Sequence, residues 1–205
     1  MHIDLAPFSP CPAVQHLGYE LLLESSSSLR LIVQLEGSLA ATLPITNRVG
    51  QRQFGLWQHH CFELFIGELE SNAYWELNLA PNGNWNCFKF SDYRKDQRES
   101  EAYSLAGLQA VRSAQSYRLE ANIDIKPILK KKGLETMRLE ARGLEATGLE
   151  ATGLEKRGLE KRSLALSLGA SAVIATATQL NYFSIRHGAT PDFHHRDHHM
   201  QWVLQ

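Results

Sequence analysis

The sequence contains little cysteine, no long apolar run and almost no net charge. Its cysteines, Cys11, Cys61 and Cys87, lack the CxxC spacing of a metal site. An odd, sparse count argues against a disulfide framework and suits a reducing compartment. No run approaches the roughly 20 apolar residues of a membrane-spanning helix. A net charge of −1 over 205 residues gives no field that would recruit nucleic acid or an anionic membrane.

Common catalytic motifs are missing as well. The chain has no GxSxG, HExxH, P-loop or Rossmann GxGxxG motif. Residues 1–16 contain Asp4 and no apolar stretch of the kind that forms the centre of a signal peptide. We therefore expect a cytoplasmic protein that is not an enzyme and that binds neither membrane nor nucleic acid.

Residues 56–94 are the most informative part of the sequence, with strand-like runs at 61–66, 74–80 and 85–90. The last two flank Pro81-Asn82-Gly83-Asn84, and Asn and Gly accept positive φ readily, which predicts a β-hairpin. Side chains alternate between the two faces of a strand, so Trp75 is expected in the core.

Alternation of apolar and polar residues predicts strands elsewhere too, at 17–24, 29–35, 117–126, 164–168, 171–177, 181–186 and 199–204. Many short strands separated by turns are typical of sandwiches and barrels. We predict an all-β fold of ten or eleven strands, an antiparallel sandwich of immunoglobulin or jelly-roll type.

Residues 130–163 differ from the rest because Leu followed by Glu recurs every five residues. On a helix a five-residue step turns each Leu by about 140°, so the leucines would not form a stripe. Frequent Gly also weakens a helix. A β-solenoid would need small residues at fixed inward positions. We expect a polar insertion that interrupts a single domain spanning residues 1–205, with a basic interaction segment as the alternative.

The C-terminal run Pro191-Asp192-Phe193-His194-His195-Arg196-Asp197-His198-His199 is rich in imidazole and carboxylate groups. These groups ligate zinc and other transition metals, which makes a metal site a hypothesis for His194, His195, His198 and His199. The flanking strands favour a polar loop whose imidazoles hydrogen-bond to the backbone or to Asp. Contact with an organic ligand is the third interpretation.

The candidate ligand site combines flat rings with hydrogen-bonding groups. Aromatic rings can stack on the C–H faces of sugars, and strand-to-loop exits often carry binding groups. On these grounds we predict stacking by Trp57, Trp85 and Tyr93, and hydrogen bonds from His59, Arg94, His194, His195 and Asp197. Glu63 and Glu76 lie in mid-strand, and glutamates are usually exposed. We interpret them as solvated or structural, not as a catalytic pair.

Four segments carry a family resemblance: LWQHHCFELFIG, YWELNLAPNGNWNCFKFSDYR, YFSIRHG and PDFHHRDHH. Together they resemble the DOMON-like domains of bacterial proteins, which are related to the family-9 carbohydrate-binding modules. The resemblance covers about 15–130 and 163–205, and FELF with YWELNLAPNGNW is its most specific part. It implies a β-sandwich whose relatives bind haem or sugars. Haem-binding relatives use a Met/His axial pair, for which this chain offers Met200.

We therefore predict a ligand-binding domain, without a cofactor, for a small polar ligand such as a saccharide or sugar-containing metabolite. The alternatives are a domain that binds haem or a divalent transition metal through the His cluster, and a protein-interaction domain whose partner the sequence does not identify.

Overall fold

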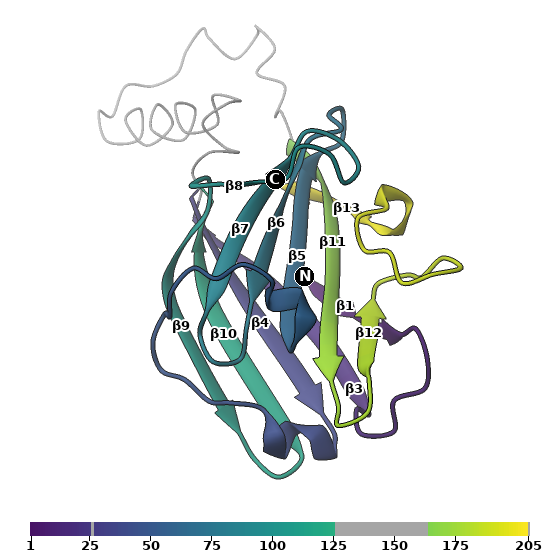
Figure 1. The fold of residues 1–205 in the computed structure, drawn as a ribbon. Coiled ribbons are helices and arrows are strands. Elements are labelled where there is room, and N and C mark those ends of the chain that lie inside the picture. Colours follow the sequence, from purple (N-terminus) through teal and green to yellow (C-terminus); the bar gives the residue numbers. More distant parts are fainter. Residues whose placement is uncertain (26, 126–163, 205) are drawn as a thin grey trace, which may run out of the picture.

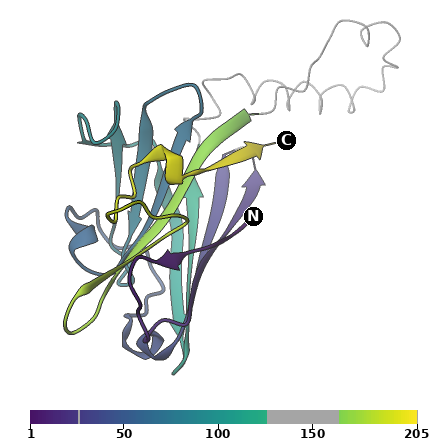
Figure 2. The same cartoon turned by 90° about the vertical axis from the view of Figure 1, so that its right-hand side faces the viewer.

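The structure is a computed structural model that describes residues 1–25, 27–125 and 164–204. Two antiparallel sheets pack face to face, as predicted for an all-β sandwich (Figure 1, Figure 2). Sheet A contains, in spatial order, β1 (His2–Asp4), β3 (His16–Ser25), β4 (Ser28–Glu36), β10 (Ser116–Asp124) and β9 (Ser104–Arg112).

Sheet B is the larger layer and faces the viewer in Figure 1. Its order is β2 (Ala6–Pro7), β12 (Leu180–Ser184), β11 (Leu164–Ala175), β5 (Cys61–Glu68), β6 (Tyr74–Leu79), β7 (Trp85–Phe90) and β8 (Arg98–Glu99). One further strand, β13 (Met200–Leu204), also pairs with β11.

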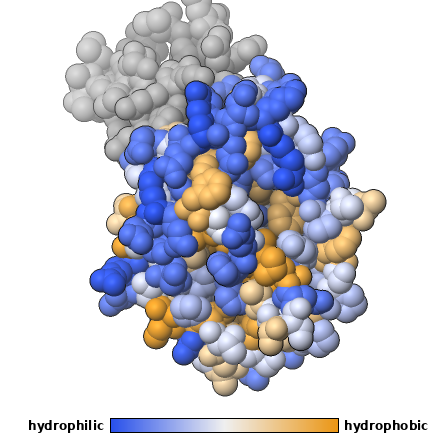
Figure 3. Space-filling model, viewed as in Figure 1, coloured by the Kyte–Doolittle hydropathy of each residue, from blue (hydrophilic) through white to orange (hydrophobic). Residues whose placement is uncertain are grey.

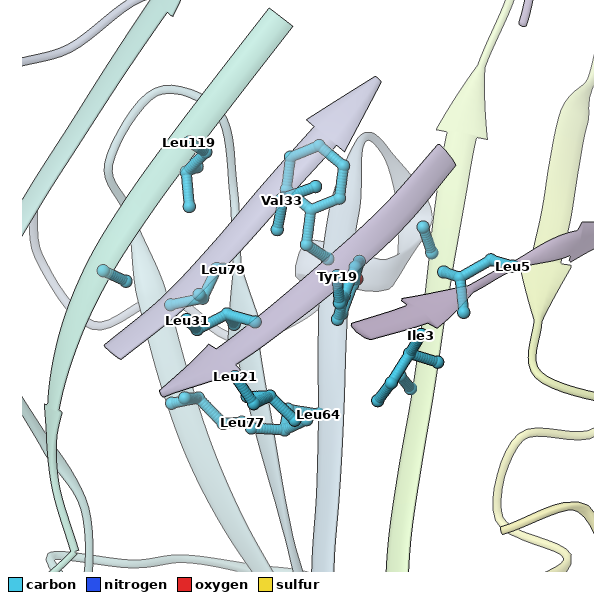
Figure 4. Packing of buried hydrophobic residues seen from close by; sticks show 14 of the residues in the cluster. Ile3, Leu5, Tyr19, Leu21, Leu31, Val33, Leu64, Leu77, Leu79 and Leu119 are labelled. Carbon is cyan, nitrogen blue, oxygen red and sulfur yellow. The ribbon is translucent and has the colours of Figure 1, made fainter. Parts of the chain in front are cut away.

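The core lies between the sheets and is built by the inward side chains of both. Leu31 and Val33 of β4 belong to the same buried cluster as Leu64 and Leu77 of sheet B (Figure 4). Trp75 is 8% exposed within this core, which confirms its predicted position. The three cysteines are free and buried.

The predicted hairpin at residues 81–84 is confirmed. The Ala80 N–H donates to the Asn84 carbonyl at 2.8 Å, and the Gly83 N–H donates to the Ala80 carbonyl at 2.9 Å. Gly83 has φ 96, which is in the left-handed region that glycine adopts without steric cost.

Some strand predictions need correction. The two strands predicted at 164–168 and 171–177 are one, because β11 runs through Gly169 without a break. Four strands were not predicted: β1, β2, β8 and β9. Three of these have only two or three residues, too few for a periodic signal. The predicted insertion at 130–163 lies outside the described residues.

Helical structure in the described ranges consists of short 3-10 turns at η1 (Ser38–Thr42), η2 (Leu56–Gln58) and η3 (Arg196–His198). Among the described residues, no helix has both the length and the apolarity needed to span a membrane.

The topology places a loop across the outer face of sheet B, the face turned away from sheet A. β12 pairs with residues 171–175 of β11, whereas β13 pairs with residues 164–168. The chain must therefore leave the sheet after β12 and return at the other half of β11. Residues 185–199, called here the covering segment, make this connection (Figure 2).

Candidate functional site

The outer face of sheet B is buried, although its strands alternate as if one face met water. Glu63 of β5 is 3% exposed and Glu76 of β6 is 4% exposed. Of the two alternatives predicted for these glutamates, solvated or structural, the solvated one is therefore wrong. The physical reason is the chain that lies over them, which includes η2 and the covering segment.

An aromatic cluster holds these covering elements against the sheet. Phe65, Tyr74, Phe88 and Phe90 are buried on the outer face, and Trp57 of η2 and Phe193 of the covering segment pack against them. The Tyr74 and Phe90 rings stack with centroids 4.8 Å apart, and Trp57 meets Phe88 edge-on at 5.8 Å. Such ring pairs stabilise beyond the area they bury.

A cavity of about 460 Å³ opens between the sheet and its covering elements. Its polar lining comes from Gln58, Glu63, Glu76, Arg94, Gln97 and His194. Aromatic side chains also line it, from Trp57, Phe90, Tyr182 and Phe193. On this face polar and apolar residues lie intermingled (Figure 3). A cavity that combines apolar surface with hydrogen-bonding groups can hold a small molecule.

The two carboxyl groups in this cavity are near neighbours. Glu63 pairs with Asn78 across β5 and β6, and Glu76 lies two residues from Asn78 on the same face. This is the diagonal relation of an antiparallel pair, with about 7–8 Å between Cα atoms and less between side chains. The fold thus brings together two acidic side chains that are 13 positions apart in sequence.

In each carboxyl group, one oxygen accepts a hydrogen bond from a neighbouring side chain. Ser171 Oγ donates to Glu63 Oε2 at 2.7 Å, and Asn78 Nδ2 donates to Glu76 Oε1 at 2.7 Å. Within the described part of the chain, Glu63 Oε1 and Glu76 Oε2 accept no hydrogen bond. The second oxygen of each group is therefore free to meet a ligand.

Burial raises the pKa of both carboxyl groups. The Glu76 charge raises the pKa of Glu63 further, and the hydrogen bonds from Ser171 and Asn78 offset only part of the increase. Two like charges in a site of low polarity resist simultaneous ionisation. The pair consequently keeps protons at a pH where exposed glutamates are fully ionised.

His194 connects the carboxyl pair to the rim of the cavity. The backbone N–H of Arg94 donates to Tyr74 Oη at 3.3 Å, and Tyr74 Oη lies 2.7 Å from His194 Nδ1. If the tyrosine hydroxyl donates to Nδ1, the imidazole proton sits on Nε2, which is 3.8 Å from Glu76 Oε2. Burial lowers the pKa of His194 to about 4, so the contact with Glu76 is not a salt bridge near neutral pH.

The rim is closed by an ion pair between two loops. Arg94 Nη2 lies 3.1 Å from Asp192 Oδ1, and Tyr93 also donates to Asp192. Arg94 has φ 52, a left-handed conformation that costs a non-glycine residue about 1–3 kcal/mol. The ion pair orients the guanidinium of Arg94 and joins the covering segment to the loop after β7.

A second cavity of about 460 Å³ lies beside the first, and both are lined by His194. The second is lined by Tyr74, Tyr93, His195, Arg196 and Asp197, among others. Arg196 anchors this region because its guanidinium donates to the carbonyls of Glu68 and Ser71.

The structure brings together six of the eight residues predicted for the ligand site. Trp57, Arg94 and His194 line the first cavity, and Tyr93, His195 and Asp197 line the second. His59 is exposed and lines neither. Trp85 faces the core, 8% exposed, with the Arg52 guanidinium 4.5 Å from its ring centre. Whether these residues bind a ligand stays a prediction.

The histidines of the covering segment have separate partners. His198 Nδ1 lies 3.2 Å from the Asp192 carbonyl, and His199 lies between Ser167 Oγ at 3.2 Å and the Phe193 carbonyl at 3.0 Å. Among the described residues, no three His, Cys, Asp or Glu side chains are grouped to hold a metal ion. Met200, the residue considered for haem ligation, packs against the core between the sheets.

Sequence reasoning missed the cavity floor. Glu63 and Glu76 were interpreted as solvated or structural, and Phe90, Tyr182 and Phe193 were not selected for the ligand site. One signal was available in the strand CFELFIG: Glu63 shares its face with Cys61 and Phe65. A face that contains a cysteine and a phenylalanine beside a single acid is unlike a solvated face.

Comparison with known proteins identifies the fold. A scan against models of known protein families finds no match, and a search of curated proteins finds none either. The chain is similar to a solved structure described as a "putative carbohydrate-binding protein from Bacteroides uniformis", with 8% identity and a TM-score of 0.57. The match covers 99% of this chain and 87% of the other. At this identity the likeness shows a shared fold, and the DOMON-like and family-9 relationship stays a prediction.

Proposed function

We propose that the first cavity binds a saccharide or sugar-containing metabolite and that the protein is a non-catalytic binding domain. The observation that supports this most is the composition of the cavity: aromatic rings lie beside two buried carboxyl groups, each with an unused oxygen. Sugars combine apolar C–H faces with hydroxyl groups, and this lining offers a partner to each.

The size of the cavity supports the same proposal. Its volume of about 460 Å³ lies within the 300–1,000 Å³ range of small-molecule sites. The similar solved structure is described as a "putative carbohydrate-binding protein", which supports a sugar as the first ligand class to test.

Isothermal titration calorimetry with a panel of mono- and disaccharides tests the proposal. We expect at least one sugar to bind, and Trp57→Ala to weaken binding by about tenfold through loss of a stacking surface. Ile45→Ala is the matched control, since Ile45 is 59% exposed and lines neither cavity. Flat titrations with every sugar, or equal losses in both variants, would contradict the proposal.

A further inference from the structure

The floor of the first cavity is acidic, and among the described residues no cationic side chain is in direct contact with its two carboxyl groups. In the described part of the chain no Lys or Arg lies within salt-bridge distance of Glu63 or Glu76. Arg94 is the cationic side chain in the lining, and it is engaged by Asp192 at the rim, at 3.1 Å. Buried charges in proteins are normally paired with an opposite charge or neutralised by a proton.

The remaining titratable neighbours do not supply the missing cation. Cys61 of β5 faces the same side of the sheet, and burial raises the pKa of its thiol well above the ordinary value, so it stays neutral. His194 of the covering segment is neutral as well because burial lowers its pKa. The Asn78 amide already donates to Glu76 Oε1. Among the described residues, the two free carboxyl oxygens thus have no positively charged group in direct contact, and the charge of Arg94 lowers their pKa only partly and from a distance.

We propose that the missing partner is the ammonium group of the ligand, so that the site selects a sugar carrying a primary amine. The ammonium would donate to Glu63 Oε1 and Glu76 Oε2, and the sugar ring would lie against the aromatic wall that includes Trp57 and Phe90. This inference rests on the proposed saccharide site and names its substrate class.

An organic cation fits the lining better than a metal ion. Calcium requires six to eight oxygen ligands and magnesium six in a strict octahedron. Here two free carboxyl oxygens face a cavity that is also lined by the rings of Trp57 and Phe90, and aromatic faces attract organic ammonium groups. An ammonium with three N–H donors needs few acceptors and replaces the proton that the carboxyl pair otherwise retains.

Isothermal titration calorimetry with matched ligands tests whether the site prefers a ligand that carries an amine. Glucosamine is compared with N-acetylglucosamine and glucose at pH 7, and cyclohexylamine with cyclohexanol. We expect glucosamine to bind about tenfold or more tightly than either uncharged sugar. Binding should also release protons, measured as a dependence of the heat on the ionisation enthalpy of the buffer.

Variants of the two glutamates test whether the preference for glucosamine arises at the carboxyl pair. Glu63→Gln and Glu76→Gln retain the shape of the side chain and remove its charge, so each should abolish the preference for glucosamine over glucose. Glu70→Gln, at an exposed position in the turn after β5, is the matched control and should retain the preference.

The outcomes separate the inference from the proposed function. Equal binding of glucosamine and glucose would overturn the amine while leaving the saccharide site intact. If no sugar binds but cyclohexylamine binds in a Glu63-dependent manner, the amine inference stands and the saccharide proposal fails. If neither the sugars nor cyclohexylamine bind, both are overturned.

Discussion

The outer faces of the two sheets contain the same geometric pair with opposite chemistry. In sheet A, Arg30 pairs with Asn122 across β4 and β10, and Glu120 lies two residues from Asn122 on the same face. In sheet B, Glu63 and Glu76 are related in the same diagonal way through Asn78. Sheet A thus places an acid beside a base, whereas sheet B places two acids side by side.

The environments of these pairs differ as much as their charges. Glu120 is half-buried, 3.5 Å from Arg30 Nη1 and 2.8 Å from Arg118 Nη2. Ion pairs of this exposure contribute little to stability and are common on protein surfaces. Glu63 and Glu76 are buried without such partners, which costs free energy and needs an explanation beyond folding. Strongly perturbed acids in a cavity are typical of functional sites.

The largest expected difference between the two pairs is in stability at pH 8. The raised pKa values of Glu63 and Glu76 mean that folding stability falls as pH rises above the ordinary glutamate pKa, since the unfolded chain then loses protons that the folded chain retains. The double variant Glu63→Gln/Glu76→Gln should therefore increase the free energy of unfolding at pH 8 by about 2 kcal/mol or more. Urea denaturation measures this.

Two controls accompany this experiment: a variant in sheet A, and a repeat of the urea denaturation at lower pH. Glu120→Gln should lower stability at pH 8 by about 0.5 kcal/mol, as expected for an ordinary ion pair. The gain in the double variant should shrink as pH falls toward about 4, where both states bind the protons. A double variant less stable than the wild type at pH 8 would show that burial of Glu63 and Glu76 does not destabilise the fold.

A second comparison concerns the contact of the covering segment with β11 of sheet B. A Cβ on Gly169 of β11 would come within 2.4 Å of His199 Nε2. His199 is fixed by Ser167 and the Phe193 carbonyl, so Gly169→Ala should cost about 1–3 kcal/mol. Thermal unfolding measures the loss.

Gly107 of β9 in sheet A provides the match. A Cβ there would meet Asn122 Nδ2 at 3.4 Å, an ordinary contact. We expect Gly107→Ala to change stability by less than about 0.5 kcal/mol. Equal losses at both glycines would mean that the contact of His199 with β11 does not matter to stability.

A smaller effect concerns the charge of His194. Burial lowers its pKa to about 4, so its imidazole stays neutral as pH falls below the ordinary histidine pKa. In NMR spectra its ring resonances should show no shift of the size that imidazole protonation causes between about pH 5.5 and 8. His194→Gln assigns the resonance by its disappearance. A midpoint near the ordinary histidine value would indicate that water reaches the ring.

The strands and their faces were predictable because alternation is local. The hairpin at Asn82-Gly83 and the inward position of Trp75 depend on residues within a few positions of one another. The continuity of β11 was not predictable in this way, since Gly169 interrupts the apolar pattern, and the structure shows the His199 ring packed close to it.

The cavity floor required information that alternation does not contain. A period-two pattern separates two faces but does not say what covers the outer one. Glu63 and Glu120 each occupy the outward side of a strand, and the chain that lies over Glu63, including η2 and the covering segment, distinguishes them. The diagonal neighbours of Glu63 depend on strand register, which is set by contacts between distant parts of the chain.

The most direct test of this account is a crystal structure of the protein grown with glucosamine. We predict electron density for the sugar in the first cavity, with its amine between Glu63 Oε1 and Glu76 Oε2 and its ring against Trp57. An empty cavity with the sugar bound elsewhere, on the outer face of sheet A for example, would contradict the claim that the covered face of sheet B is the binding site.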